Sequence, residues 1–497
     1  QLAPLLNVAS LRPPLTAALA QGRGQPATLA RALAATRAPE VLEPLLERVA
    51  QAGDAELDVL TEYFAEGLAD GRAAEPLLAR LAETKAPATR ARLIVLLGWT
   101  RAPRVLPALH AALTEPSEPV QLASLAAIGR IADPSSIPGV APLLHAKRAE
   151  LRHAAARSYA ALLREAEVSQ LLEQIDSDAA ADRGALLECA GLALGRLGAQ
   201  QALTPESVRR ALKVLTRWLG SDDARLSAAA LDALRRSRQP DAAKIIAREL
   251  LSPKAWRRAA ATFALVDFPG DETRRLLRFV LQRSAPRSTL AALIALGEVG
   301  DQRDAAALVR VAERGHWPLP AAASYALARL AERGDVKKRT FERGLCELTQ
   351  LSDPYARANI VSGLAALGGG SCADLDVRGW YAAGQPSVLR SAVAHWLRAR
   401  ADAEDGLEPE LGELLAQCLG DSDPLVRAAC APLRERQAKR ALDLTAHAAD
   451  DETELRERLI AVRFENGTTV IAYTDANARL LLPEVPAGPI TLEDPGE

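Results

Sequence analysis

The sequence contains no methionine and few aromatic residues. Phenylalanine, tryptophan and tyrosine together make up 4% of the 497 residues, whereas 49% are apolar and 25% are charged. Such a composition is too apolar for a disordered chain, and it suits thin helical layers packed with leucine, valine and alanine. The chain also has no run of about 18 uninterrupted apolar residues, so the sequence predicts no membrane-spanning helix.

Cysteine and histidine are equally sparse. The five cysteines are Cys189, Cys346, Cys372, Cys418 and Cys430. Their odd number and the absence of a Cys-x-x-Cys pair predict reduced thiols rather than a secreted disulfide framework, and hence a cytoplasmic location. No signal peptide is visible at the start of the sequence. Because no histidine has His-Glu-x-x-His spacing, we expect no metal site and no cofactor, although His145 and His153 could face each other.

A near-neutral total charge hides a strongly uneven distribution. The chain has 61 basic and 63 acidic residues, but residues 209–287 hold 18 basic and 8 acidic residues, a net charge of +10. Residues 39–84 hold 3 basic and 11 acidic residues, and residues 441–497 hold 4 and 12, so each has a net charge of −8. The basic middle of the chain is therefore flanked by two acidic regions, one near each end of the sequence.

The basic stretch supplies the candidate partner-binding residues. Arginine recognises carboxylates and phosphates through its planar guanidinium, and tryptophan can stack on bases or on side chains of a partner. The predicted contacts are Arg209, Arg210, Lys213, Arg217, Trp218, Arg235, Arg236, Trp256, Arg257, Arg258, Arg274, Arg275 and Arg278. An acidic protein and a nucleic acid are both candidate partners; alternatively, the chain's own acidic ends or a homotypic contact balance these arginines.

A helical pattern of about 32 residues recurs along the chain. Examples are EPVQLASLAAIGRIAD at residues 118–133 and DPYARANIVSGLAALGG at residues 353–369. The repeats start near Pro87, Pro119, Glu150, Arg183, Asp223, Pro253, Pro286, Pro318, Pro354, Pro386 and Pro424. Proline suits the first position of a helix, and Asp353 or Asp423 before it can cap the free amides. Leucines at i, i+3, i+4 and i+7 supply the buried stripe.

A second helical stretch separates each pair of starts, which predicts stacked antiparallel helical hairpins. Residues 118–144, EPVQLASLAAIGRIADPSSIPGVAPLL, resemble bacterial HEAT repeats, including the HEAT-like repeats of phycobilin lyases. The resemblance implies an all-α fold, an α-α superhelix of about 11–12 hairpins over residues 26–437. Residues 1–25 are expected to form an irregular segment or cap.

The pattern changes near the end of the sequence. Residues 438–457 are predicted to form an acidic helical linker, followed by a small β segment over residues 458–497. RLIAVRFE at residues 458–465 and TTVIAYTD at residues 468–475 alternate as strands, and Asn466-Gly467 between them favours a two-residue type I′ turn.

Two further strands are expected, at residues 478–485 and 490–493. The ending TDANARLLLPEVPAGPITL resembles part of a carboxypeptidase-regulatory-like domain, except that Ala478 stands where glycine is usual. Because an isolated hairpin is marginally stable in water, we expect the segment to pack on the solenoid or on a partner.

Catalytic motifs are weak. Residues 369–373, GGSCA, approach the Gly-x-Ser-x-Gly elbow but lack the last glycine and follow a helix, which favours a loop between repeats. Cys372 could be exposed in such a loop, but exposure alone does not make it a nucleophile. Asp267, near Trp256, faintly resembles the catalytic aspartate of HEAT-like DNA glycosylases, without an extended motif.

The sequence therefore predicts a non-enzymatic protein–protein interaction scaffold or adaptor with an acidic protein partner. A nucleic-acid-binding HEAT protein that uses residues 209–287 is the alternative, and a HEAT-fold lyase or DNA glycosylase is a remote one. The oligomeric state is not indicated.

Overall fold

A computed structural model provides the structure of the chain. It describes residues 12–20, 28–30, 33, 44–46, 49, 52–64, 71–177, 183–283, 285–334, 336–370, 372, 375–403, 407–430, 440–447, 454–464, 467–485 and 490–495. The chain divides into two compact units, residues 1–215 and residues 216–497, which are described separately.

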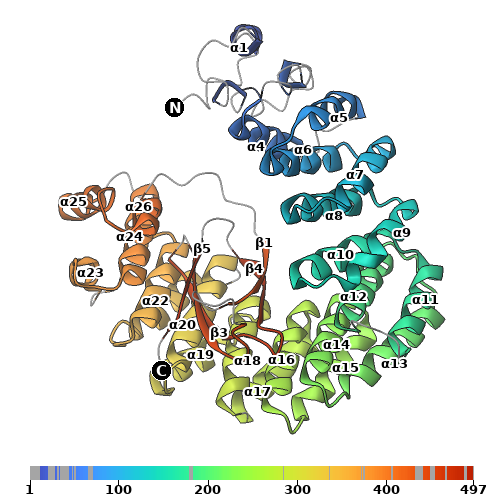
Figure 1. Cartoon of the computed structure of the whole chain (residues 1–497). Helices are drawn as coiled ribbons and strands as arrows, with labels where there is room; N and C mark the ends of the chain where they lie inside the picture. Colours follow the sequence, from blue (N-terminus) through green and yellow to red (C-terminus); the bar gives the residue numbers. More distant parts are fainter. Residues whose placement is uncertain are drawn as a thin grey trace. The chain divides into compact units, whose positions relative to one another are not determined.

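The first unit consists of helices (Figure 1). These are α1 (Arg12–Ala20), α4 (Asp54–Tyr63), α5 (Ala74–Glu83), α6 (Pro87–Trp99), α7 (Leu106–Leu113), α8 (Glu118–Ile131), α9 (Ile137–Val140), α10 (Ala149–Leu162), α11 (Glu165–Asp176), α12 (Arg183–Ala199) and α13 (Pro205–Leu219), which contains the division.

The second unit continues the helical array and ends in strands (Figure 1). Its helices are α14 (Ala224–Ser237), α15 (Pro240–Arg248), α16 (Ala255–Ala264), α17 (Asp271–Arg283), α18 (Pro286–Val299), α19 (Ala305–Arg314), α20 (Leu319–Arg333), α21 (Lys338–Glu347), α22 (Pro354–Ala366), α23 (Val377–Tyr381), α24 (Ser387–Ala403), α25 (Pro409–Cys418) and α26 (Pro424–Cys430). Its strands are β1 (Arg440–Thr445), β2 (Leu459–Phe464), β3 (Thr469–Tyr473), β4 (Arg479–Val485) and β5 (Ile490–Glu493).

The predicted repeat is confirmed as a HEAT-like α-solenoid. Each predicted start lies within two residues of the first residue of an even-numbered helix, from α6 to α26. The predicted caps also form, because the carboxylate of Asp353 accepts a hydrogen bond from the Ala356 N–H at 2.7 Å, and that of Asp423 accepts one from the Leu425 N–H at 2.8 Å.

One arginine recurs near the start of many even-numbered helices. In α6, Arg90 donates to the carbonyl oxygens of Leu81 and Thr84, both at 2.8 Å, at the end of the preceding odd-numbered helix. Arg183 likewise binds the carbonyl oxygens of Ile175 and Ser177 at the end of α11, where the last carbonyls lack partners within the helix. In other repeats the arginine binds carbonyl oxygens of the connecting segment just before its own helix, as Arg152, Arg258, Arg357, Arg390 and Arg427 do. We call these bonds repeat-closing, because each ties an even-numbered helix to the chain that connects it to the preceding helix.

Small residues set the spacing between successive even-numbered helices. A Cβ atom placed on Gly98 of α6 would lie 2.6 Å from the Cα of Ala127 in α8. Gly297 of α18 approaches Ala326 of α20 in the same way, with the corresponding distance at 3.0 Å. The helices therefore pack backbone against backbone at these points.

The strands form two small antiparallel sheets, one with the order β1-β4 and one with the order β3-β2-β5. The β2–β3 hairpin and the strands β4 and β5 confirm the predicted β segment. The predicted helical linker over residues 438–457 is wrong at Arg440–Thr445, which forms β1 and pairs with β4. Its partner strand lies far along the chain, so the local composition gave no sign of this pairing.

The predicted two-residue turn at Asn466-Gly467 lies partly outside the described residues, because Asn466 is not described. At its flanks, Phe464 donates its N–H to the Thr468 carbonyl, and Gly467 has a φ of +80°, in the left-handed region that favours glycine.

The sheets pack on the even-numbered helices of the second unit (Figure 1). Val462 and Val470 belong to the same buried apolar cluster as Leu389 and Val393 of α24. The contact also contains a polar anchor, because the buried side chain of Asn359 in α22 bonds to both backbone groups of Thr469. The Asn359 Oδ1 accepts the Thr469 N–H at 2.8 Å, and its Nδ2 donates to the Thr469 carbonyl at 2.9 Å. Asn359 thus pairs with β3 as a neighbouring strand would.

Replacing Asn359 with alanine should destabilise the second unit. Both backbone groups of Thr469 would stay buried without partners, at a cost of about 2–4 kcal/mol. Urea unfolding would measure this loss, and amide hydrogen exchange should accelerate at Thr469. Asn477→Ala is the control, since its side chain makes one exposed 3.5 Å bond to the Arg225 carbonyl. Equal losses for the two variants would contradict the anchoring role.

Substituting Gly98 with alanine should also destabilise the chain, by about 1–3 kcal/mol, because the new Cβ would push α6 away from α8. Gly412→Ala is the matched control, since Gly412 lies within helix α25 and a Cβ added there would meet no atom within 4 Å. The Gly412→Ala change should stabilise the protein by about 0.5–1 kcal/mol, because alanine has a higher helix propensity than glycine. Thermal unfolding of both variants would test this requirement for close packing. A midpoint that shifts in the same direction for both variants would contradict it.

Candidate interaction surfaces

The arginines of α14 are bound within the protein. Asp232 accepts hydrogen bonds from Arg235 at 2.7 Å and from Arg236 at 2.6 Å, and Arg479 of β4 lies 3.6 Å away. Burial alone would raise the pKa of Asp232, but the three arginines outweigh it and hold that pKa below its ordinary value. Asp232 is therefore an ionised carboxylate held by arginines of both the solenoid and the sheet.

The acidic end of the chain completes this arrangement. Asp443 of β1 accepts hydrogen bonds from Arg236 at 3.0 Å and from Arg479 at 2.6 Å. We call Asp232, Arg235, Arg236, Asp443 and Arg479 the Asp232 cluster. Within this cluster the basic stretch is balanced by the chain's own acidic end, which is the alternative left open by the sequence.

Asp267 does not stand free for catalysis. Its Oδ2 accepts a hydrogen bond from Arg235 at 2.5 Å. The side chain therefore neutralises an arginine of the Asp232 cluster, and this geometry gives no support to a glycosylase-like role.

The other predicted contacts of the second unit are also largely paired. Arg274 lies 2.7 Å from Asp271, Arg278 lies 2.6 Å from Asp304, and Arg275 lies 3.4 Å from Glu272. Arg257 lies 3.6 Å from Glu249, while Arg258 makes the repeat-closing bonds to carbonyl oxygens. Trp256 lines a cavity. Arg217 and Trp218 each interact with another part of the protein, so neither is free.

In the first unit, the predicted contacts lie on α13. Arg209 is 3.6 Å from Glu206 and Arg210 is 2.9 Å from Glu173, both as exposed ion pairs. Such pairs contribute little to stability and exchange readily. Lys213 is exposed.

Two residues that the sequence analysis did not single out form a polar site in the first unit. The guanidinium of Arg130 in α8 stacks on the Trp99 ring of α6, 4.4 Å from its centroid. The Arg130 Nη1 and the Trp99 Nε1 are both buried, and neither has an acceptor among the described residues. Burial lowers the pKa of Arg130, with no carboxylate to offset it. The two residues stand at the same place in successive repeats, after Gly98 and Gly129, which is the only sequence signal that could have indicated them.

The cysteines contradict the prediction of reduced thiols. Cys346 and Cys372 are joined by a disulfide with Cα atoms 5.4 Å apart, and Cys418 and Cys430 by one with Cα atoms 6.1 Å apart. Cys189 is the buried free thiol among the described residues. The pairs are 26 and 12 residues apart and meet only through the stacking of helices, so their spacing did not reveal them. Cys372, whose exposure the sequence left open, is therefore half of a disulfide rather than a free thiol.

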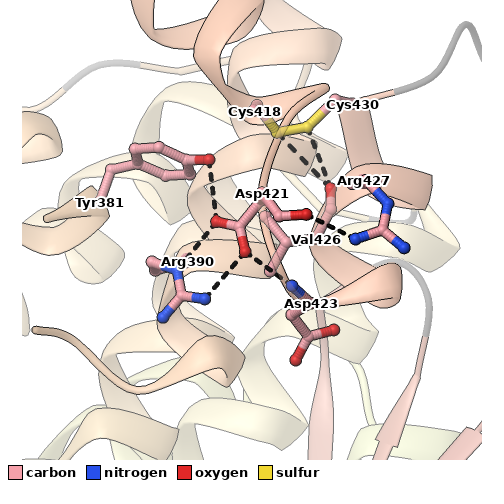
Figure 2. The surroundings of a disulfide bond; sticks show 8 residues. All are labelled: Tyr381, Arg390, Cys418, Asp421, Asp423, Val426, Arg427 and Cys430. Carbon is pink, nitrogen blue, oxygen red and sulfur yellow. Dashed lines mark hydrogen bonds and ion pairs between the residues drawn. A yellow bond between two sulfur atoms is a disulfide. The ribbon is translucent and has the colours of Figure 1, made fainter. Parts of the chain in front are cut away.

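A compact ionic cluster lies beside the second disulfide (Figure 2). Asp421 accepts two hydrogen bonds from Arg390, at 2.9 and 3.0 Å, and one from the Tyr381 hydroxyl at 3.1 Å. The bonds from Arg390 lower the pKa of Asp421 to about 2, while burial, followed by the charge of Asp421, raises the pKa of Tyr381 to about 12. This cluster ties α24 to the loop before α26.

Neither metal binding nor membrane insertion finds support. Within the described part of the chain, no group of three or more histidine, cysteine, aspartate and glutamate side chains could hold a metal ion. His153 lies 2.5 Å from Glu188 rather than facing His145. Among the described helices, none is both long and apolar enough to cross a bilayer.

Comparison with known proteins agrees with the fold. Residues 74–160 match the HEAT repeats family. Together with the architecture, this match supports HEAT-like repeats within the helical array. No curated protein matches the chain by sequence.

Solved structures with similar architecture are distant in sequence. Kap95p, solved with RanGDP, is 13% identical over 86% of this chain and 68% of its own, with a TM-score of 0.41. Kap121p is 13% identical over 85% of this chain, with a TM-score of 0.34, and the chain spans only 56% of it. The CpcE–CpcF phycocyanin lyase complex from Nostoc sp. PCC7120 is 16% identical, covers 49% of this chain and 94% of that chain, and has a TM-score of 0.29. A bacterial origin and the carboxypeptidase-regulatory-like resemblance stay predictions.

The hydrogen bonds of Asp421 should make the free energy of unfolding depend on pH in the acid range. The pKa of Asp421 is about 2 in the folded state, below the ordinary 3.8. The stabilisation by Asp421 is therefore fully present above about pH 4 and is lost as the pH falls through 2. The stability difference between the wild type and Asp421→Asn in urea should shrink by about 2 kcal/mol between pH 5 and pH 2. The exposed Asp222→Asn provides the control and should show no such change. A difference independent of pH would disprove the assignment.

Proposed function

We propose that this chain is a protein-interaction scaffold whose partner binds residues 1–215 at Trp99 and Arg130. The observation that carries the proposal is the pair of buried N–H donors, Arg130 Nη1 and Trp99 Nε1, without acceptors among the described residues. A buried donor without an acceptor costs free energy, and a partner carboxylate that reached the edge of this stacked pair and accepted these N–H groups would recover it. The partner is therefore expected to present an acidic side chain.

The surroundings of this pair suit a binding hot spot. Tryptophan and arginine dominate the energetics of many interfaces when they are partly desolvated and flanked by apolar contacts. Val95 precedes Trp99 by one turn of α6, Ala126 precedes Arg130 by one turn of α8, and both are partly or fully exposed. None of the described residues in 1–215 forms a strand, so no sheet occupies these helices within that unit.

The arginines of residues 209–287 contribute less to this proposal than the sequence indicated. Those of the Asp232 cluster and of α17 already bind carboxylates, so a partner would have to displace these bonds. Arg209 and Lys213, which are exposed, remain predicted contacts.

Affinity capture from the source cells tests the proposal. The wild type, Arg130→Ala, Trp99→Ala and Arg148→Ala would be compared after nuclease treatment. Arg148 is the control, since it is an exposed arginine that makes an ion pair with Glu118. We expect the wild type and Arg148→Ala to retain one stoichiometric protein, and both other variants to reduce its recovery at least about tenfold, as for a hot-spot loss of about 1.4 kcal/mol or more.

Two outcomes would overturn the proposal. Equal recovery by Arg130→Ala and Arg148→Ala would show that the partner binds elsewhere. Loss of all bound material on nuclease treatment, with binding that weakens steeply with salt, would favour nucleic acid instead. Unfolding midpoints of the variants would separate lost binding from lost folding.

The predicted cytoplasmic location has lost the argument on which it rested. That argument was the prediction of reduced thiols, whereas four of the five cysteines form disulfides in the structure. Since disulfides persist mainly in oxidising compartments, the location stays a prediction without that support.

A further inference from the structure

A cavity of about 120 Å³ lies in the second unit between the solenoid and the sheet. Helices α14, α16 and α18 form one wall, and β3, β4 and the turn between them form the other. The partner-binding surface proposed for residues 1–215 does not involve this cavity.

Most of the lining is apolar. The side chains come chiefly from the exposed edge of α16 and from the strands, and they include Leu231, Trp256, Phe263, Ile294, Tyr473 and Leu481. Ala259, Ala260 and Ala291 leave the space open, because larger side chains at these positions would fill it. An apolar cavity of about 150 Å³ in another protein binds benzene; this one is somewhat smaller, but it is open to solvent on one side, so a ligand no larger than a single ring is the size it suits.

The charged part of the lining is already satisfied within the protein. Asp232, Arg235 and Arg479 bind one another in the Asp232 cluster. The Oδ1 of Asp475 accepts the N–H groups of Asn477 and Arg479, both at 2.8 Å. A charged ligand would therefore lose its hydration without gaining a free counter-ion, which favours an uncharged one.

One polar group of the lining lacks a partner among the described residues. Arg287 of α18 lies 3.3 Å from Glu457 through its Nη1, and its guanidinium stacks on the Tyr473 ring at 4.6 Å. Its Nε is buried and has no acceptor within the part of the chain that the structure describes. A ligand oxygen that accepts this N–H would remove the cost of the unpaired donor.

We propose that this cavity binds a small uncharged aromatic molecule of single-ring size that carries one carbonyl-type oxygen, with Arg287 Nε as the donor to that oxygen. Trp256, Phe263 and Tyr473 surround the ring. Tyr473, 37% exposed, lies at the edge of the cavity that opens to solvent. Pockets of this kind, apolar with one placed polar group, are typical of small-molecule sites between packed structural layers.

Two probes of equal shape test the proposal. Acetophenone carries the carbonyl oxygen, and α-methylstyrene replaces that oxygen by a CH₂ group. Ligand-observed NMR titrations of the full chain should show saturable binding of both probes, with acetophenone at least about fivefold tighter because of the hydrogen bond from Arg287.

Variants assign the binding to this cavity. Ala291→Leu should abolish binding of both probes, whereas Ala416→Leu, on an exposed position of α25, should leave both affinities unchanged. Arg287→Met should bind α-methylstyrene within about twofold of the wild type and lose the preference for acetophenone. If Arg287→Met does not fold, Arg287→Lys serves instead, since it keeps a positive charge towards Glu457 and has no Nε.

The outcomes are distinct. No saturable binding of either probe, or binding that persists in Ala291→Leu, would overturn the cavity as the site. Equal affinities of the two probes in the wild type would overturn the role of Arg287. Neither result depends on the partner captured through Trp99 and Arg130.

Discussion

The repeat-closing bond, from an arginine near the start of an even-numbered helix to carbonyl oxygens of the chain just before that helix, is the interaction on which the connection of the hairpins depends. A solenoid has no central core, so each hairpin is stable only against its neighbours. Arg90, Arg258 and Arg427 make such bonds, far apart in the sequence. Once the hairpins are closed, glycines such as Gly98 let the even-numbered helices approach backbone to backbone. The spacing between repeats follows from these two features.

The array could be predicted because its signals are local. Proline at the first helical position, an aspartate cap and a leucine stripe all lie within one helix, so the sequence located each start within two residues. The strands after residue 458 were equally visible through their alternation. Strand β1 was missed because its assignment depends on β4, about 35 residues later, and because the stretch that follows β1 is acidic and helix-like in composition.

The candidate site could be predicted only in part, because a charge pattern does not show which charges are already paired. The basic stretch is plain in the sequence, but the pairing of Arg236 with Asp443 and of Arg287 with Glu457, both from the acidic end of the chain, is not. The disulfides were hidden for the same reason, since stacking brings the cysteines together. Conversely, Arg130 lies in an unremarkable helix and becomes notable only because no carboxylate among the described residues reaches its buried Nη1.

The packing of the sheet on the solenoid has a consequence for how the chain folds. Contacts between repeats join residues about 30 positions apart, and they can form as the chain emerges from the ribosome. Thr469, by contrast, bonds to Asn359 across 110 positions, and Asn477 reaches Arg225 across 252. The apolar edge of α16 and α18 therefore stays uncovered during synthesis until the strands follow. Such late, long-range closure slows folding and leaves a nascent chain dependent on protection from aggregation.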